Sequence, residues 1–249
     1  MAANLSRTAQ LQVILGSSGV SFQDVIDVAR YGAKVAIAPE ASAAIIFSRK
    51  FIEEYAASDT PVYGVSTGFG ALANRHIAVE DRVQLQKSLI RSHAAGVGPA
   101  VETEVVRALM FLRLRTMASG RTGVRLKLAQ QYVDFLNSGI TPIVPEFGSL
   151  GCSGDLAPLS HCALAMMGEG RVHDASGEVM PAVDALKAVG IQPIELEEKE
   201  GLALINGTDG MLGMLIMACA DLEQLCTVAD ITTAMSIEGL LGTDQVFAP

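Results

Sequence analysis

Apolar residues recur at helical spacing in two neighbouring segments of the chain, residues 79–95 and 102–119. Such spacing places apolar side chains on one face of a helix. The apolar positions of the second segment include Val105, Val106, Leu109, Met110 and Leu112. A glycine follows each segment directly, at Gly96 and Gly120, and glycine commonly stands just past the end of a helix. The pattern therefore predicts two consecutive amphipathic helices.

Start and stop signals predict helices in much of the remaining chain. Ser21 can accept a hydrogen bond at a helix start, and Asp24 stands at the capping-box distance from it. Pro39 suits the first turn of the next helix, and Gly139 suits the end of a later one. The other predicted helices cover residues 39–58, 122–138, 155–167, 181–189 and 208–236.

Strands have a minor place in the expected fold. Residues 171–180 favour a small hairpin, and the prolines and glycines of residues 141–154 predict a loop. Strand and helix patterns do not alternate, so no βαβ unit is expected, and the sequence indicates a mainly α protein with minor short strands. The charged stretch 195–200 resembles a linker. We therefore expect a boundary that divides the chain into residues 1–200 and residues 201–249.

Composition limits the classes of partner. The chain of 249 residues is 50% hydrophobic, which excludes intrinsic disorder, and its net charge of −9 argues against a nucleic-acid binder. The charge is uneven: residues 1–125 carry 14 Lys and Arg against 10 Asp and Glu, whereas residues 126–249 carry 4 against 17. We expect the acidic half to present a solvated acidic surface.

One apolar window resembles a membrane segment. Residues 201–220 contain a single charged residue, Asp209, but the uninterrupted apolar run covers only residues 211–220, which is short for a bilayer and favours a buried helix. Residues 1–10 lack the layout of a secretion signal, and the cysteines form no Cys-x-x-Cys pair. We expect a cytoplasmic protein with reduced thiols and no membrane partner.

Three glycine-rich loops combine flexible backbone with polar side chains, at residues 63–70, 148–159 and 204–210. The glycine spacing of the second loop does not match the dinucleotide-binding fingerprint, and the phosphate-loop and nucleophile-elbow motifs are also absent from the sequence. The histidines do not pair at helical spacing, so no metal site is expected.

The sequence Cys152-Ser153-Gly154 can form an electrophile from its own backbone. The nitrogen of Gly154 can attack the carbonyl carbon of Cys152, because glycine has no Cβ to obstruct the approach. The five-membered ring that closes then loses one water, and Ser153 loses its hydroxyl as a second water. The product carries an exocyclic methylidene group. The first residue contributes only its carbonyl, so its side chain is open to change.

These loops together resemble the histidine/phenylalanine/tyrosine ammonia-lyase family, in the same order and over essentially the whole chain. Residues 148–159 resemble the family signature, whose Ala-Ser-Gly triad becomes 4-methylidene-imidazol-5-one. Residues 63–70 resemble the tyrosine loop, and residues 206–208 resemble the asparagine motif. Cys152 replaces the more common alanine. The resemblance implies that the Cys-Ser-Gly triad forms the same cofactor here.

The resemblance also implies roles for individual side chains. Tyr63 would be the catalytic base, Asn206 would bind the substrate or the cofactor carbonyl, and Gly70 and Asp155 would support the two loops. His93, within Ser-His-Ala-Ala-Gly, resembles the histidine-specific members and would contact the substrate imidazole. The residues alone leave blander alternatives: a loop tyrosine at Tyr63, an Asx turn at Asn206, a structural histidine at His93 and a helix N-cap at Asp155.

The implied reaction converts L-histidine to trans-urocanate and ammonia. A tyrosine or phenylalanine ammonia-lyase, or an aminomutase with the same cofactor, remains an open alternative. Family members are much longer and combine residues from several subunits, so the resemblance implies an N-terminal half that ends inside a central bundle of long helices. We expect a homo-oligomer, tetrameric for the intact family enzyme. We expect this half alone to have an incomplete active site, and the alternative is a non-catalytic half-subunit that needs a separate C-terminal chain. The apolar helix after Thr208 also predicts association.

Overall fold

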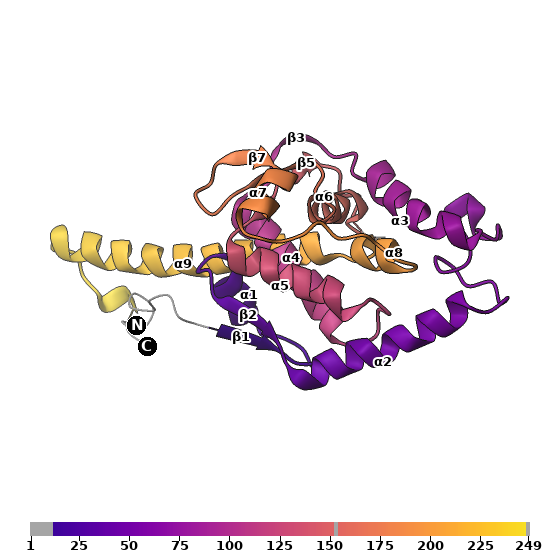
Figure 1. Cartoon of the computed structure of the whole chain (residues 1–249). Coiled ribbons are helices and arrows are strands. Elements are labelled where there is room, and N and C mark those ends of the chain that lie inside the picture. Colours follow the sequence, from indigo (N-terminus) through magenta and orange to yellow (C-terminus); the bar gives the residue numbers. More distant parts are fainter. Residues whose placement is uncertain (1–11, 152–153, 248–249) are drawn as a thin grey trace.

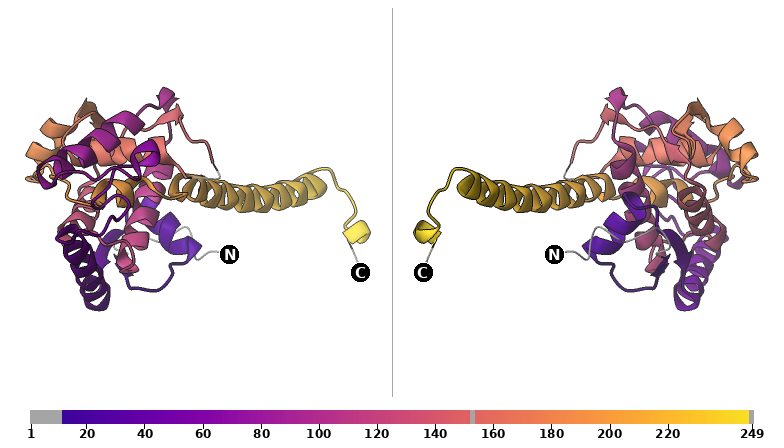
Figure 2. Two further views of the ribbon diagram at one scale, coloured as in Figure 1. Left: turned by 90° about the vertical axis from the view of Figure 1, so that its right-hand side faces the viewer. Right: turned by 90° about the vertical axis from the view of Figure 1, so that its left-hand side faces the viewer.

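Helices surround one central helix, α4, and a long helix, α9, projects from the body (Figures 1 and 2). The computed structural model describes residues 12–151 and 154–247. The larger helices are α1 (Phe22–Ala29), α2 (Pro39–Ala56), α3 (Val79–His93), α4 (Thr103–Ala118), α5 (Leu126–Ser138), α6 (Leu156–Met166), α7 (Ala182–Ala188), α8 (Glu200–Ile205) and α9 (Asp209–Gly239). Two short 3-10 turns are η2 (Gly70–Leu72) and η3 (Gln245–Phe247). The strands are β1 (Gln12–Leu15), β2 (Lys34–Ile37), β3 (Val97–Ala100), β4 (Thr141–Pro142), β5 (Pro145–Phe147), β6 (Arg171–His173) and β7 (Val179–Pro181).

Two helices begin or end at the capping residues that the sequence predicts. The Ser21 hydroxyl accepts a hydrogen bond from the Asp24 amide at 3.1 Å, and the Asp24 carboxylate accepts one from the Ser21 amide at 2.8 Å. This capping box begins α1. Gly139 follows α5 with a φ of +80°, the left-handed conformation that ends many helices. The mainly α fold class is confirmed.

The expectation that the chain holds no βαβ unit is wrong. Strands β1 and β2 pair in parallel, with Val13 opposite Val35, and α1 connects them. Each strand has only four residues, a length at which an apolar run does not distinguish a strand from part of a buried helix.

Strands also interrupt the segment 141–154 that was predicted as a loop. Strand β4 pairs with β6 of the expected hairpin, and β5 pairs with β3. Pro142 and Pro145 are tolerated because both strands lie at the edge of their small sheets.

The core is built around α4, which packs against α1, α2, α5 and the first part of α9. Its largest buried side chains are Met110, Phe111, Leu114 and Met117, and none of them is exposed to solvent. Helix α4 contacts other helices on several sides, and it therefore fixes the positions of the elements packed around it.

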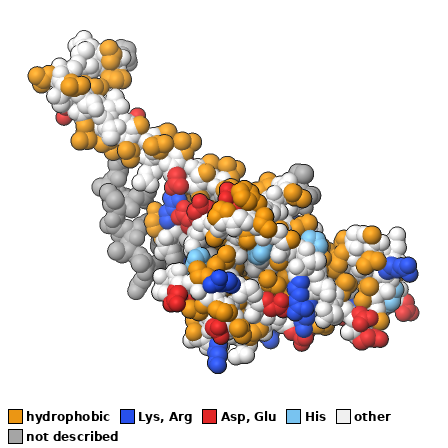
Figure 3. All heavy atoms as spheres, turned by 90° about the horizontal axis from the view of Figure 1, so that it is seen from above, with side chains coloured by type: hydrophobic (Ala, Val, Ile, Leu, Met, Phe, Trp, Pro, Cys, Tyr) orange, Lys and Arg blue, Asp and Glu red, His pale blue; other side chains and the backbone are white. Residues whose placement is uncertain are grey.

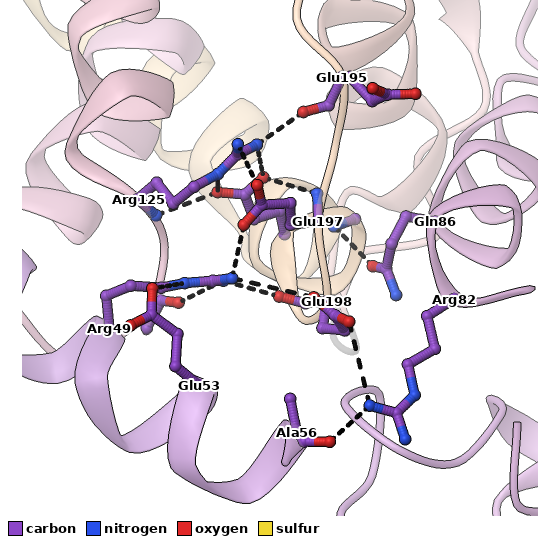
Figure 4. A network of polar contacts seen from close by, with 12 residues as sticks. Arg49, Glu53, Ala56, Arg82, Gln86, Arg125, Glu195, Glu197 and Glu198 are labelled. Carbon is purple, nitrogen blue, oxygen red and sulfur yellow. Dashed lines mark hydrogen bonds and ion pairs between the residues drawn. The ribbon is translucent and has the colours of Figure 1, made fainter. Parts of the chain in front are cut away.

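The stretch 195–200 that resembled a linker is bound to the rest of the protein by ion pairs (Figure 4). Arg125 contacts Glu200 at 2.6 Å and Glu197 at 2.6 Å, and Arg49 contacts Glu197 at 2.8 Å. Lys87 of α3 contacts Glu195 at 2.8 Å. The segment is therefore fastened to α2, α3 and the start of α5, and the division of the chain at residue 200 stays a prediction.

Helix α9 is buried at its start and exposed beyond it. Gly213, Ile216 and Met217 pack into the body. The large exposed apolar residues farther along, which we call the α9 apolar surface, are Leu222, Leu225, Val228, Ile231 and Met235. Hydrophobic side chains follow this projecting arm in Figure 3.

The apolar window is longer than the sequence indicated. The stretch from Glu200 to Gly239 is long and apolar enough to cross a membrane by length and composition, a test that core helices of soluble proteins also pass. The short run at residues 211–220 is thus no argument against a membrane, and the expected absence of a membrane partner stays a prediction.

Candidate active site

Gly154 occupies a position that only glycine fits. Cys152 and Ser153, the other two residues of the predicted cofactor triad, lie outside the described residues. Gly154 has a φ of +122°, and its amide donates a hydrogen bond to the Gly151 carbonyl at 2.7 Å. A Cβ at this position would lie 3.1 Å from the Gly207 carbonyl oxygen. Left-handed backbone and close approach of a second chain segment both require glycine here.

Asp155 joins the cofactor loop to helix α9. Its amide donates a hydrogen bond to the Gly207 carbonyl at 2.6 Å. Its carboxylate accepts hydrogen bonds from the Ser149 hydroxyl at 2.5 Å and from the Met211 amide at 2.9 Å. Asp155 stands at the N-cap position of α6, as expected from the sequence, but its side chain caps the first turn of α9 instead of α6. This buried carboxylate therefore links two helix starts.

Asn206 lies in the turn between α8 and α9 with an exposed side chain. Its amide N–H donates to the Leu202 carbonyl at 3.1 Å, and its carbonyl accepts from Arg113 at 3.1 Å. Its side-chain amide makes no hydrogen bond with any described residue, so no Asx turn is formed within residues 12–151 and 154–247. The side chain can therefore contact a bound molecule.

Tyr63 lies in the loop between α2 and η2 with 47% of its surface exposed. Its hydroxyl accepts a hydrogen bond from the Gly70 amide at 3.3 Å, and its ring packs edge-to-face on Phe69 at 5.8 Å between centroids. The neighbouring Gly64 carbonyl accepts a hydrogen bond from the Lys199 amide at 3.0 Å. The tyrosine loop is thus attached to the start of α8, the helix that leads to the asparagine motif.

His93 is the last residue of α3. Its Nδ1 lies 2.9 Å from the Leu89 carbonyl and 3.0 Å from the Ser92 hydroxyl, and the carbonyl, which only accepts, favours the tautomer that is protonated at Nδ1. The Nε2 atom is then the one available to a ligand. Three residues farther on, the Gly96 amide donates to Nε2 of His161 on α6 at 3.1 Å. Burial lowers the pKa of His161, which keeps this imidazole neutral and able to accept.

The structure brings together some of the predicted residues directly and others through intermediate segments. Gly154 and Asp155 contact the turn that holds Asn206. The segment after His93 is joined to α6, and a Cβ on Gly148 would lie 3.1 Å from the Gly96 Cα. Within the described part of the chain, no hydrogen bond joins the tyrosine loop directly to the cofactor loop.

The site also includes three residues that the sequence did not predict as part of it, Arg113, Asp209 and His161. Arg113 and Asp209 form a buried ion pair behind Asn206. Both carried a signal, because each is a charged residue within an apolar helical segment, where charges are rarely buried without a partner. His161 lies 65 residues from Gly96 in the sequence, so no local pattern predicts its hydrogen bond with the Gly96 amide.

Among the described residues, no group of three or more His, Cys, Asp or Glu side chains is arranged to hold a metal ion. The residues gathered around Gly154 instead offer backbone amides, a neutral imidazole, a phenol and a carboxamide. Such groups can bind and orient a small polar molecule and move a proton.

Comparison with known proteins points to one family. The profile described as aromatic amino acid lyase matches residues 20–249. Histidine ammonia-lyase of Streptomyces griseus is 63% identical over 237 residues, which are 95% of this chain and 46% of that protein. Histidine ammonia-lyase of Myxococcus xanthus is 42% identical over 96% of this chain and 47% of that protein. The chain spans about half the length of these curated relatives.

Solved structures give the same picture of the fold. Tyrosine aminomutase from Streptomyces globisporus superposes with a TM-score of 0.85 at 39% identity, over 92% of this chain and 43% of that one. Histidine ammonia-lyase from Trypanosoma cruzi superposes with a TM-score of 0.85 at 34% identity, over 94% of this chain and 45% of that one.

Proposed function

Because the chain belongs to the aromatic amino acid lyase family, we propose that it is the N-terminal part of a histidine ammonia-lyase, which converts L-histidine to trans-urocanate and ammonia. The observation that carries this proposal is the seating of Gly154 against Gly207, which joins the cofactor loop to the asparagine motif. The identity of 63% to a protein named for this reaction supports histidine as the substrate.

Gly154 fits the 4-methylidene-imidazol-5-one group that the family implies. Its positive φ and the Gly207 carbonyl at 3.1 Å from its Cβ position make a cradle that a side chain would fill. Cys152, Ser153 and Gly154 would form the group, which supplies an electrophile that turns the substrate amino group into a better leaving group. The start of α6 directly after the triad offers a positive helix end to an oxygen that gains charge.

Tyr63 is proposed to remove the substrate β-proton. A phenol ordinarily has a pKa of about 10, so it needs stabilisation as the phenolate to act near neutral pH. The Gly70 amide already donates a hydrogen bond to the phenol oxygen, and this bond strengthens when the oxygen carries negative charge. Gly70 therefore supports the base directly.

His93 and Asn206 are proposed to hold the substrate. In the tautomer that donates from Nδ1 to the Leu89 carbonyl, Nε2 of His93 is an acceptor suited to the N–H of a substrate imidazole. The exposed carboxamide of Asn206 can donate to the substrate carboxylate or to the cofactor carbonyl. Together these side chains would fix the two ends of the amino acid.

The rest of the subunit and further copies are proposed to complete the site. The chain spans about half of its relatives, and the exposed α9 apolar surface leaves a large hydrophobic area for another part of the protein. We propose a homo-oligomer in which the missing half and neighbouring subunits supply the remaining residues around the substrate.

A second candidate is an aminomutase acting on tyrosine, because the structure also superposes on a tyrosine aminomutase. The two are separated by incubating the subunit, completed with its C-terminal half, with L-histidine, L-tyrosine and L-phenylalanine. The proposal predicts the ultraviolet absorbance of urocanate from L-histidine alone. A β-amino acid from tyrosine, with no urocanate from histidine, would favour the aminomutase.

A further inference from the structure

Arg113 binds three oxygen atoms around the turn that carries Asn206. Its guanidinium donates to the Ala203 carbonyl at 2.9 Å and to the Asn206 carbonyl at 3.1 Å. It also donates to the Asp209 carboxylate, and both members of this ion pair are buried. The carbonyls belong to the end of α8 and the carboxylate to the start of α9. One planar cation thus holds the two helix ends that define the turn.

The same guanidinium lies directly against the backbone of Gly207. A Cβ on Gly207 would lie 1.7 Å from Nη2 of Arg113, so the turn is seated on the guanidinium itself. On its other side, Gly207 accepts the hydrogen bond from the Asp155 amide at 2.6 Å and lies against Gly154. Gly207 is therefore held between Arg113 and the cofactor loop.

Asp209 keeps this arrangement neutral. Burial raises the pKa of Asp209, while Arg113 acts in the opposite direction by attraction and hydrogen bonding. A buried cation without this carboxylate would carry a large desolvation cost. The pair is thus a fixed element behind the turn and leaves Asn206 facing outward.

We propose that Arg113, held by Asp209, is a positioning residue that presses the Asn206–Gly207 turn onto the cofactor loop. Its hydrogen bonds go to the turn and to Asp209, so it acts through the turn. Its role in catalysis rests on the proposed function, whereas its effect on the position of the turn does not. Loss of the planar fork would separate Gly207 from Gly154 and release the Asn206 side chain.

Arg107 provides a matched control on the same helix. It is also buried in α4, and it also donates to backbone carbonyls, those of Val28, Ala29 and Leu136. Those carbonyls belong to α1 and α5 and not to any loop of the site. If Arg113 only stabilised the fold as a buried arginine of α4, replacing Arg107 would have the same effects as replacing Arg113.

The test compares Arg113→Lys with Arg107→Lys in the same protein. Hydrogen exchange of the Asp155 amide reports the contact with Gly207, and the thermal midpoint reports general stability. A lysine keeps the charge but cannot make the three bonds together. We expect Arg113→Lys to raise the exchange rate at Asp155 by about tenfold or more, the size expected for lost bonds to a charged group, while Arg107→Lys leaves it within about twofold even where the midpoint falls.

The second variant, Asp209→Asn, covers the case in which Arg113→Lys does not fold. It removes the charge partner and leaves both carbonyl bonds, so we expect a smaller rise in Asp155 exchange in the same direction. Equal exchange in both arginine variants, unchanged exchange in Arg113→Lys or Asp209→Asn, or fast exchange at Asp155 in the unaltered protein would each overturn the proposal. Hydrogen exchange needs no substrate. A failure of the protein to form urocanate would therefore count against the proposed function without affecting this test of Arg113. In the active subunit, Arg113→Lys should also raise KM for L-histidine more than Arg107→Lys does.

Discussion

Gly207 is the residue at which the asparagine motif meets the cofactor loop. Its carbonyl accepts from Asp155, and its missing Cβ leaves the space that Arg113 occupies. The sequence presents the same glycine only as part of an Asn-Gly turn, a common signal that does not predict its contact with Arg113, 94 residues earlier in the chain. The individual side chain chemistry of the site could be foreseen, but the contact that brings the loops together could not.

Replacing Gly207 with alanine should destabilise the protein. The new methyl group would lie on the Arg113 guanidinium, and forced overpacking costs about 1–3 kcal/mol of unfolding free energy. Gly239→Ala is the control, since a Cβ there meets nothing within 4 Å. Urea denaturation measures both. Equal stability of the two variants would contradict the close seating of Gly207.

Tyr63→Phe should remove activity and leave folding unchanged. The ring is half exposed and the substitution removes only the hydroxyl, so the rate of urocanate formation should fall about 10²–10⁴-fold, as for loss of a general base. Tyr55→Phe on α2, with the same 47% exposure, should keep full activity. A Tyr63→Phe enzyme with normal turnover would exclude Tyr63 as the base.

The buried His161 predicts a loss of stability in acid. Burial lowers the pKa of His161 from 6.5, so below about pH 6.5 the unfolded chain binds a proton at this site more readily than the folded chain does. The free energy of unfolding therefore decreases as the pH is lowered. His161→Gln should flatten this fall below about pH 6.5. Denaturation curves across this range give the slopes. An identical slope for His161→Gln and the unaltered protein would contradict the account.

Helices could be predicted from the sequence where their start and stop signals lie close to the helix ends. The Ser21 capping box and the Gly139 stop lie within a few residues of the helix ends they determine. Strands β1 and β2 were missed because their pairing joins residues 22 positions apart, as in Val13 with Val35, in runs of only four residues. Similarly, the side chain of Asp155 was expected at its own helix and instead caps α9, because tertiary contacts choose among the free amides nearby.

Helix α9 should drive association through its exposed part. Leu225→Glu places a charge within the α9 apolar surface and should reduce the mass found by light scattering toward that of a monomer. Gln224→Glu adds the same charge one residue away at an exposed polar position and should leave association unchanged. A monodisperse monomer for the unaltered chain would contradict this role of α9.

The two differently charged parts of the sequence meet in the whole molecule. Ion pairs join Arg30 to Asp221, Lys87 to Glu195, Arg113 to Asp209 and Arg125 to Glu200. Some of the acidic side chains that were expected to form a solvated surface therefore pair with basic side chains of residues 1–125. An exposed pair such as Lys87 with Glu195 contributes little stability singly. Together with the pairs that Arg49 and Arg125 form, it fastens the segment 195–200 to α2, α3 and the start of α5 (Figure 4).

The proposed reaction depends on the cofactor that forms in the cofactor loop, and the mass of a peptide containing this loop is its most direct test. Trypsin should release residues 128–171 as one peptide that contains Cys152, Ser153 and Gly154. In a subunit that forms urocanate from L-histidine, we predict that this peptide is lighter than its sequence by two water molecules, and that Ser153→Ala abolishes both the loss of two waters and the activity. A peptide of full mass from an active subunit would contradict the account.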